Sequence, residues 1–124
     1  MEYKLRIDKH KACSTNTLRS AQRWASHNLK KKYSAIYNPI IKSMNIPQFE
    51  GRVQIDIFYN SRLDPDNVSG KFIIDAFVEC GVIKDDSKKY VKRFSVENLP
   101  ELPSDTYIIR IRTNEDGNQK TMNL

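Results

Sequence analysis

The stretch from residue 53 to residue 97 constrains the fold most, because its hydrophobic period changes twice. Val53, Ile55, Ile57 and Tyr59 alternate with other residues, which is the period of a strand with one buried face. Apolar residues then recur at spacings of three and four, and predict a helix over about 67–80 that Asp66 or Asn67 caps and Gly81 ends. A third strand is expected over about 89–97. This order of strand, helix and strand indicates a domain that mixes helices with a sheet.

The flanking stretches complete the predicted fold. Alternating residues predict strands over 2–8 and 107–112. Between them, a long helix is expected from Leu18, capped by Thr17 and carrying Leu18, Ala25, Leu29 and Ile36 as its apolar stripe. Asn38 and Pro39 are expected to interrupt it and to start a short helix that ends near Met44. We therefore predict an α/β (α+β) fold over 1–112, a small mixed sheet of about four strands with two main helices, followed by a disordered tail over 113–124.

Composition excludes several classes of protein. The longest uncharged apolar runs in the 124 residues fall far short of the ~20 that span a bilayer, so no membrane segment is expected. The charged N-terminal residues do not resemble a signal peptide, which favours a cytoplasmic protein. Cys13 and Cys80 lack a Cys-x-x-Cys spacing and neighbouring histidines, so reduced thiols are expected and a zinc site is not.

Charge is distributed unevenly along the chain. Residues 1–43 hold ten Lys and Arg against two acids, whereas residues 62–86 hold six acids against three bases. The second segment therefore carries −3 within a chain of +6, and the remaining residues sum to +9. An acidic segment in a basic chain suits a nucleic-acid hydrolase, whose cations hold phosphates and whose carboxylates hold a metal. The residues expected to contact the phosphates of a nucleic acid are Arg19, Arg23, Lys30, Lys31, Lys32 and Arg62.

The acidic segment contains candidate metal ligands. Asp64 and Asp66 are one residue apart, so in an extended loop both carboxylates lie on the same side. A return of the chain through Gly81 would bring Asp85 or Asp86 back over the start of the helix. Oxygen-only ligation of this kind suits Mg²⁺, with Mn²⁺ as a substitute.

Simpler structural roles remain open for most of these residues. Aspartates beside Pro, Asn and Gly are common in turns and helix caps, and Asp75 is placed to pair with Lys71 on a solvated face. His10 and His27 are expected at the surface. Trp24 and the tyrosines are expected to pack in the core or against helices, and Lys30–Lys32 is more often a solvated face than a specific groove.

Three motifs together resemble the RusA family of Holliday junction resolvases. They are the run Arg-x-Asp-Pro-Asp-Asn from Arg62, the helix with Lys71 and Asp75, and the run Gly-Val-Ile-Lys-Asp-Asp that ends at Asp86. The resemblance is strongest over 52–97. It implies a small α/β homodimer that binds four-way DNA junctions and makes paired Mg²⁺-dependent nicks, with no small-molecule cofactor.

The family's functional residues carry over onto five positions. The resemblance implies metal binding by Asp64, Asp66 and Asp86, with Asp85 as an accessory, and a catalytic role for Lys71. The lysine stands five residues after the second aspartate, where the family pattern has four, which implies a one-residue insertion. One residue inserted within a regular helix would rotate Lys71 by about 100° around the helix axis. The insertion is therefore expected in the first turn, where Gly70 allows an irregular start.

The residues and the resemblance lead to one functional hypothesis with two alternatives. The hypothesis is a metal-dependent endonuclease that resolves four-way junctions, with Asp64, Asp66, Lys71 and Asp86 as its catalytic residues. Lys71 would stabilise the negative charge on the phosphoryl group or on the leaving oxygen. One alternative is a non-catalytic protein that binds branched DNA. The other is a nuclease that acts on flaps or ordinary duplex.

Overall fold

The computed structural model describes residues 1–113 as one α+β fold, and residues 114–124 lie outside the described part. The sheet has four strands, and three α-helices and one 3₁₀ helix connect them. The strands are β1 (Glu2–Ile7), β2 (Val53–Asn60), β3 (Val91–Asn98) and β4 (Thr106–Thr113). The helices are α1 (Thr15–Ser20), α2 (Arg23–Ser43), η1 (Pro65–Asn67) and α3 (Lys71–Glu79).

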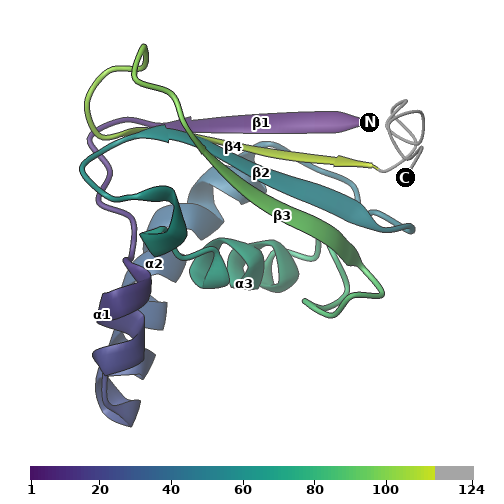
Figure 1. Cartoon of the computed structure of the whole chain (residues 1–124). Coiled ribbons are helices and arrows are strands. Elements are labelled where there is room, and N and C mark those ends of the chain that lie inside the picture. Colours follow the sequence, from purple (N-terminus) through teal and green to yellow (C-terminus); the bar gives the residue numbers. More distant parts are fainter. Residues whose placement is uncertain (114–124) are drawn as a thin grey trace, which may run out of the picture.

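The sheet is mixed, as the sequence predicts. Its order is β1-β4-β2-β3, with antiparallel pairing of β4 to both of its neighbours and parallel pairing of β2 to β3. The parallel pair needs a crossover, and α3 provides it. In Figure 1 the helices lie on one side of the sheet, and the other side carries none. The predicted disordered tail is wrong at its first residue, because Thr113 belongs to β4, and the rest of that prediction, residues 114–124, lies outside the described residues.

The hydrophobic core lies between the sheet and the helices. β2 contributes Ile55, Ile57 and Tyr59, which are fully buried. α2 contributes Tyr33, Tyr37 and Ile41, which are spaced by four and so share one face. The single long helix predicted from Leu18 is wrong, because the chain forms two helices, α1 and α2, with a break at residues 21–22. Of the predicted apolar stripe, Leu18 on α1 and Leu29 and Ile36 on α2 are partly buried against the core, and Ala25 does not belong to this set.

The predicted break at Pro39 is wrong, because α2 continues through it to Ser43. A proline inside a helix costs roughly 3 kcal/mol. Tyr37 and Ile41 lie on either side of Pro39, and both are 2% exposed. Their burial contributes roughly 1.5–3 kcal/mol each and outweighs that cost.

The helix starts also differ from the predicted ones. Ser14, rather than Thr17, caps α1, because its Oγ accepts a hydrogen bond from the backbone N–H of Thr17 at 3.0 Å. α3 begins at Lys71 after Gly70, without a side-chain cap. Gly70 is required by packing, since a Cβ there would lie 2.2 Å from Cζ of Phe94. The predicted C-terminal glycine is confirmed, because Gly81 has φ +75°.

The uncovered face of the sheet holds a buried ion cluster. Asp56 is 2% exposed, and Oδ2 accepts hydrogen bonds from Nε of Arg110 at 3.1 Å and Nε of Arg112 at 3.2 Å. Ser95 donates its hydroxyl to Oδ1. The register places these groups on adjacent strands β3, β2 and β4, so the cluster ties the sheet together from its open side.

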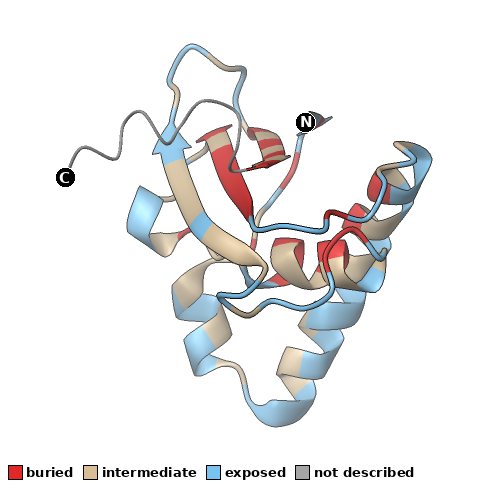
Figure 2. Cartoon of the chain, turned by 90° about the vertical axis from the view of Figure 1, so that its right-hand side faces the viewer, coloured by how far each residue is buried: buried red, intermediate tan, exposed pale blue. Residues whose placement is uncertain are grey.

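The helical hairpin of α1 and the N-terminal half of α2 projects away from the sheet (Figure 1). Figure 2 shows this part of the chain without buried residues, in contrast to the sheet and α3. Within residues 1–113 no helix combines the length and apolarity that crossing a bilayer requires. Cys13 and Cys80 are both free thiols, as predicted.

Candidate functional site

The loop after β2 carries the first pair of candidate carboxylates. Tyr59 donates its hydroxyl to the carbonyl of Leu63 at 2.6 Å, which ties the loop to the end of the strand. The backbone N–H of Asn67 then donates to the carbonyl of Asp64 at 2.8 Å and closes the turn of η1. Asp64 and Asp66 are consequently exposed on a loop that is anchored at both ends.

The segment before α1 docks directly against this loop. Ser14 pairs with Val68 in an isolated β-bridge, and the backbone N–H of Asn16 donates to Oδ1 of Asn67 at 3.0 Å. Asn67 thus holds the start of α1 beside the carboxylates. No sequence pattern indicates this contact, because it joins residues 51 apart.

A polar hollow of about 230 Å³ lies where these two segments meet. Its lining consists of Thr15, Asn16, Arg19, Asp64, Asp66 and Asn67. Asp64 and Asp66 therefore line one space, as predicted, together with the cation Arg19, although η1 replaces the expected extended loop. Carboxylate and amide oxygens are the donors that Mg²⁺ accepts, and its protein sites use one or two carboxylates beside water and substrate phosphate. The donor set of this hollow fits a magnesium ion.

Asp85 and Asp86 do not join this hollow within one chain. They lie in the loop between α3 and β3, and η1 lies at the other end of α3 (Figure 1). The nine residues of α3 span about 13 Å. Among residues 1–113, no three His, Cys, Asp or Glu side chains form a group that would hold a metal. The expected return of the chain over the start of α3 is therefore absent.

Asp85 instead organises its own loop. Its Oδ1 accepts a hydrogen bond from the backbone N–H of Ser87 at 2.7 Å. Hydrogen bonds from the hydroxyl and the backbone N–H of Ser87 lower the pKa of Asp85, so this exposed carboxylate stays charged to a lower pH than usual.

Lys71 is the first residue of α3 and lies outside the polar hollow. Its Nζ is 3.9 Å from Oδ2 of Asp75, one helical turn later, and its side chain is 56% exposed. Gly70 precedes it outside the helix, so the extra residue in the run Val68–Gly70 does not rotate Lys71 within α3. The pairing with Asp75 that the sequence left open is present.

The predicted phosphate-binding cations gather on the hairpin. Arg19 lies on α1, Arg23 and Lys30–Lys32 lie on α2, and all are exposed. The chain has no acidic residue from Lys9 to Phe49, and none of the ion pairs within residues 1–113 involves these five cations. Their charge is therefore available to an external anion.

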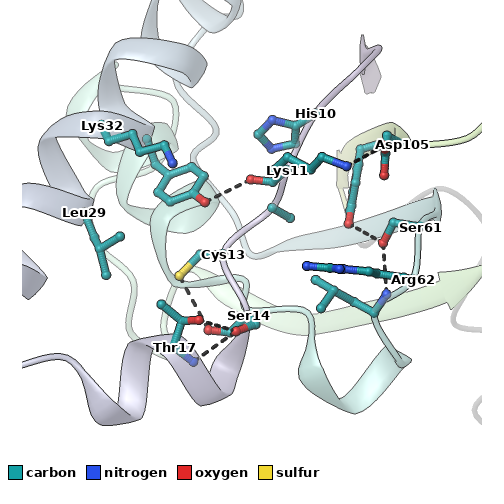
Figure 3. Close-up of a pocket in the computed structure, with 14 residues that line it drawn as sticks. His10, Lys11, Cys13, Ser14, Thr17, Leu29, Lys32, Ser61, Arg62 and Asp105 are labelled. Carbon is teal, nitrogen blue, oxygen red and sulfur yellow. Dashed lines mark hydrogen bonds and ion pairs between the residues drawn. The ribbon is translucent and has the colours of Figure 1, made fainter.

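Arg62 lies apart from the hairpin cations, across a second pocket of about 240 Å³ that Figure 3 shows. Lys32 enters this pocket from α2, and Arg62 enters from the loop after β2. The hydroxyl of Ser61 pairs with that of Tyr107 at 2.8 Å and lines the same space. The pocket shares its wall with α1, so Arg62 lies within the same region as the carboxylate loop.

His10 lines the back of this pocket, and its predicted place at the surface is wrong. It is 4% exposed, and Nε2 lies 2.8 Å from the hydroxyl of Tyr37. The rings of Tyr33 and Tyr107 also pack against it edge-on. Burial, with a smaller contribution from the charge of Lys32, lowers the pKa of His10 to about 4, so the ring is neutral at pH 7. His27 is exposed, as predicted.

Trp24 is a candidate that reading the sequence missed. Its side chain is 68% exposed at the first turn of α2, although packing in the core or on a helix was expected. The signal that was available is the composition around it, because polar and basic residues surround Trp24 from Arg19 to Lys32 with few apolar partners.

In comparisons with known proteins, no family model matches the chain and no curated protein matches it significantly. The likeness to the RusA family therefore rests on the three quoted motifs alone.

Proposed function

We propose that the protein is a metal-dependent endonuclease that cuts branched DNA, with the four-way junction as its preferred substrate. The observation that carries this proposal is the polar hollow, where Asp64 and Asp66 face Arg19 beside a helical hairpin that has no acidic residue. Carboxylates for a cation and cations for phosphates thus occur next to one another, as hydrolysis of a phosphodiester requires.

Asp64 and Asp66 hold the metal in this proposal, which is Mg²⁺ with Mn²⁺ as a substitute. A bound ion of this kind supplies an activated water and neutralises charge on the phosphoryl oxygens. Asn16 and Asn67, through their mutual hydrogen bond, keep the two segments that form the hollow in place. Arg19 then binds a phosphate oxygen beside the carboxylates and orients the strand for attack.

The hairpin holds the DNA arms through their phosphates. Arg23 and Lys30–Lys32 are exposed and make no ion pair within residues 1–113, so a phosphate that binds them breaks no ion pair of the protein and releases counterions. Such contacts carry no sequence information, and they make affinity strongly dependent on salt. Arg62 binds the same strand from the other side of the second pocket.

Asp85 and Asp86 take part only if a second copy brings them to the hollow, because α3 separates them from it within one chain. We therefore propose a symmetric homodimer in which each metal site combines Asp64 and Asp66 of one copy with Asp86 of its partner. A two-fold dimer then has two equivalent sites, which matches the two equivalent strands of a four-way junction. Lys71 stabilises charge at the edge of this shared site.

Cleavage of a labelled synthetic four-way junction tests the proposed activity. Linear duplex and a flap of the same length serve as substrate controls, each with Mg²⁺ and with chelator. Symmetric nicks at the junction, present only with metal, support the proposal. If duplex and flap are cut as readily as the junction, the protein is a nuclease of broader specificity. If no substrate is cut, the proposed activity is contradicted.

Mixing two variants tests the shared site. If the site is shared, Asp66→Asn and Asp86→Asn are inactive alone, but a mixed dimer regains one intact site and makes single nicks. If each chain forms its own site, both sites of the mixed dimer stay defective and no nicks appear. The two arrangements therefore give opposite results with the same proteins.

A binding protein without catalysis is the second candidate, and the small number of carboxylates at the hollow favours it. Two aspartates beside Asn67 also suit a turn that needs no metal. For a pure binding protein, Mg²⁺ neither produces nicks nor raises the melting temperature of the free protein. Tight junction binding together with those two negative results would select this candidate.

A further inference from the structure

Trp24 is exposed in a way that packing within the chain does not explain. Met1 and Trp24 are the large apolar side chains that stand exposed within residues 1–113, and Trp24 is the single tryptophan of the chain. Tryptophan offers a large, flat apolar surface and is normally well buried. An indole that is 68% exposed therefore has surface available for an external partner.

An apolar hollow of about 410 Å³ adjoins the indole, between α1 and the start of α2. Its apolar wall is made by Ala21, Trp24, Ala25 and Leu29, and its polar groups come from Thr17, Ser20, Asn28 and Lys32. The space is open to solvent on one side and has a flat aromatic ring at its edge. A planar partner that also carries hydrogen-bonding groups suits such a space.

Charge around the hollow selects the class of partner. Lys32 lines the hollow, and the other exposed cations of the same two helices are Arg19 on α1 and Arg23, Lys30 and Lys31 on α2. The whole region from Lys9 to Phe49 has no acidic residue. A second copy of this hairpin would bring like charges together, which disfavours self-association through this face. A nucleic acid meets both requirements, because its bases present π-faces and its phosphates match the cations.

We propose that Trp24 stacks on the unstacked face of a nucleobase at the branch point, while Arg23 and Lys32 hold the flanking phosphates. This inference rests on the proposed function, since it concerns the same DNA. The six residues of α1 span about 9 Å and connect the carboxylate hollow, which Asn16 and Arg19 line, to the turn before Trp24. The indole and the carboxylate hollow therefore lie at the two ends of one short helix.

This arrangement gives a physical reason for preferring branched DNA. Within a continuous duplex both faces of each base are already stacked on neighbours, so Trp24 gains no new partner there. A base at a branch point has a face that is not stacked, and an aromatic side chain can cover it without reading its identity. The phosphate contacts are common to both substrates and do not discriminate between them.

The single tryptophan makes the test direct, because all indole emission comes from Trp24. The full chain is titrated in chelator, without metal, with a four-way junction, a single strand and a continuous duplex of equal length. We expect junction and single strand to quench the emission and duplex to quench it much less. Equal quenching by all three, or none by any, would overturn the proposal.

Two variants separate stacking from general binding. Trp24→Ala is expected to weaken junction binding at least about fivefold, with duplex binding changed less than twofold, while Trp24→Phe keeps most of the affinity. Both are measured by anisotropy of labelled DNA, after melting curves establish that the variants are folded. An equal loss for junction and duplex would contradict a stacking role.

Other partners for the hollow and failure of the proposed activity give distinct results. Emission that changes with protein concentration without DNA would assign the hollow to a second copy. A blue shift on anionic phosphatidylserine vesicles, without any response to DNA, would assign it to a membrane surface; either result overturns the proposal. Junction-selective quenching without Mg²⁺-dependent cutting would support stacking but refute the nuclease. Mg²⁺-dependent cutting without quenching would support the nuclease but refute stacking by Trp24.

Discussion

Replacing Gly70 by alanine tests how the carboxylate loop is attached to α3 and to the sheet. The added methyl group would lie 2.2, 2.5 and 2.7 Å from Cζ, Cε1 and Cε2 of Phe94, well inside the roughly 3.5–4.0 Å of a carbon–carbon contact. Its backbone, with φ −92° and ψ −3°, suits alanine as well as glycine. Any cost of Gly70→Ala is therefore steric, and overpacking of this kind typically costs about 1–3 kcal/mol.

Urea unfolding in two backgrounds isolates this contact. Gly70→Ala alone should lower the free energy of unfolding by about 1–3 kcal/mol, which moves the midpoint by about 1 M. In a Phe94→Ala background the ring is gone, and Gly70→Ala should be neutral or stabilising by about 0.5 kcal/mol, because alanine restricts the unfolded chain. The same cost in both backgrounds would refute the steric argument.

Three further predictions concern stability. Folding lowers the pKa of His10 to about 4, so protonation of this ring opposes folding below pH 6.5. The free energy of unfolding should therefore fall by on the order of 2–3 kcal/mol as the pH drops from 6.5 toward 4. In urea titrations, His10→Gln should remove this dependence on pH. Burial raises the pKa of Asp56, but hydrogen bonds from Ser95 and Arg110 and the charges of Arg110 and Arg112 outweigh burial and lower this pKa overall. The charged carboxylate therefore stabilises the fold above its ordinary pKa of 3.8, and this stabilisation is lost as the pH falls through the lowered pKa. Asp56→Asn should cost about 3 kcal/mol at pH 7 by urea unfolding, and a change under 1 kcal/mol would show that the cluster contributes little. Gly81→Ala should lower stability by about 1 kcal/mol, measured by thermal melting, because φ is +75° and no atom within 4 Å obstructs the methyl group.

The sequence was most informative where local period determines structure. The four strands lie within about two residues of their predicted bounds, because alternation of buried and exposed residues defines a strand directly. The break at Pro39 was predicted wrongly for the opposite reason. Local propensity favours a break there, but burial of Tyr37 and Ile41 on the sheet outweighs it, and burial depends on the tertiary fold.

The candidate site was predictable in part. Asp64 and Asp66 line one space, as predicted, although Pro65–Asn67 form the 3₁₀ helix η1 where the prediction assumed an extended loop. Two other features depend on packing between distant segments, so the sequence did not predict them. They are the hydrogen bond between Asn16 and Asn67 and the position of Asp86 at the far end of α3. His10 was misplaced for the same reason, since its partner Tyr37 lies 27 residues away.

The central claim is that Asp64 and Asp66 make the protein a metal-dependent nuclease for branched DNA. The most direct test compares Asp66→Asn with Glu79→Gln in Mg²⁺-dependent cleavage of a four-way junction. Glu79 is an exposed acid of the same segment, and its carboxylate accepts a hydrogen bond from the hydroxyl of Ser34 at 3.0 Å. Glu79→Gln removes one negative charge, as Asp66→Asn does, and is therefore the matched control. We predict that Asp66→Asn loses cleavage by at least about a hundredfold while binding is kept, and that Glu79→Gln cuts like the unaltered protein. Equal activity of the two variants would contradict the claim.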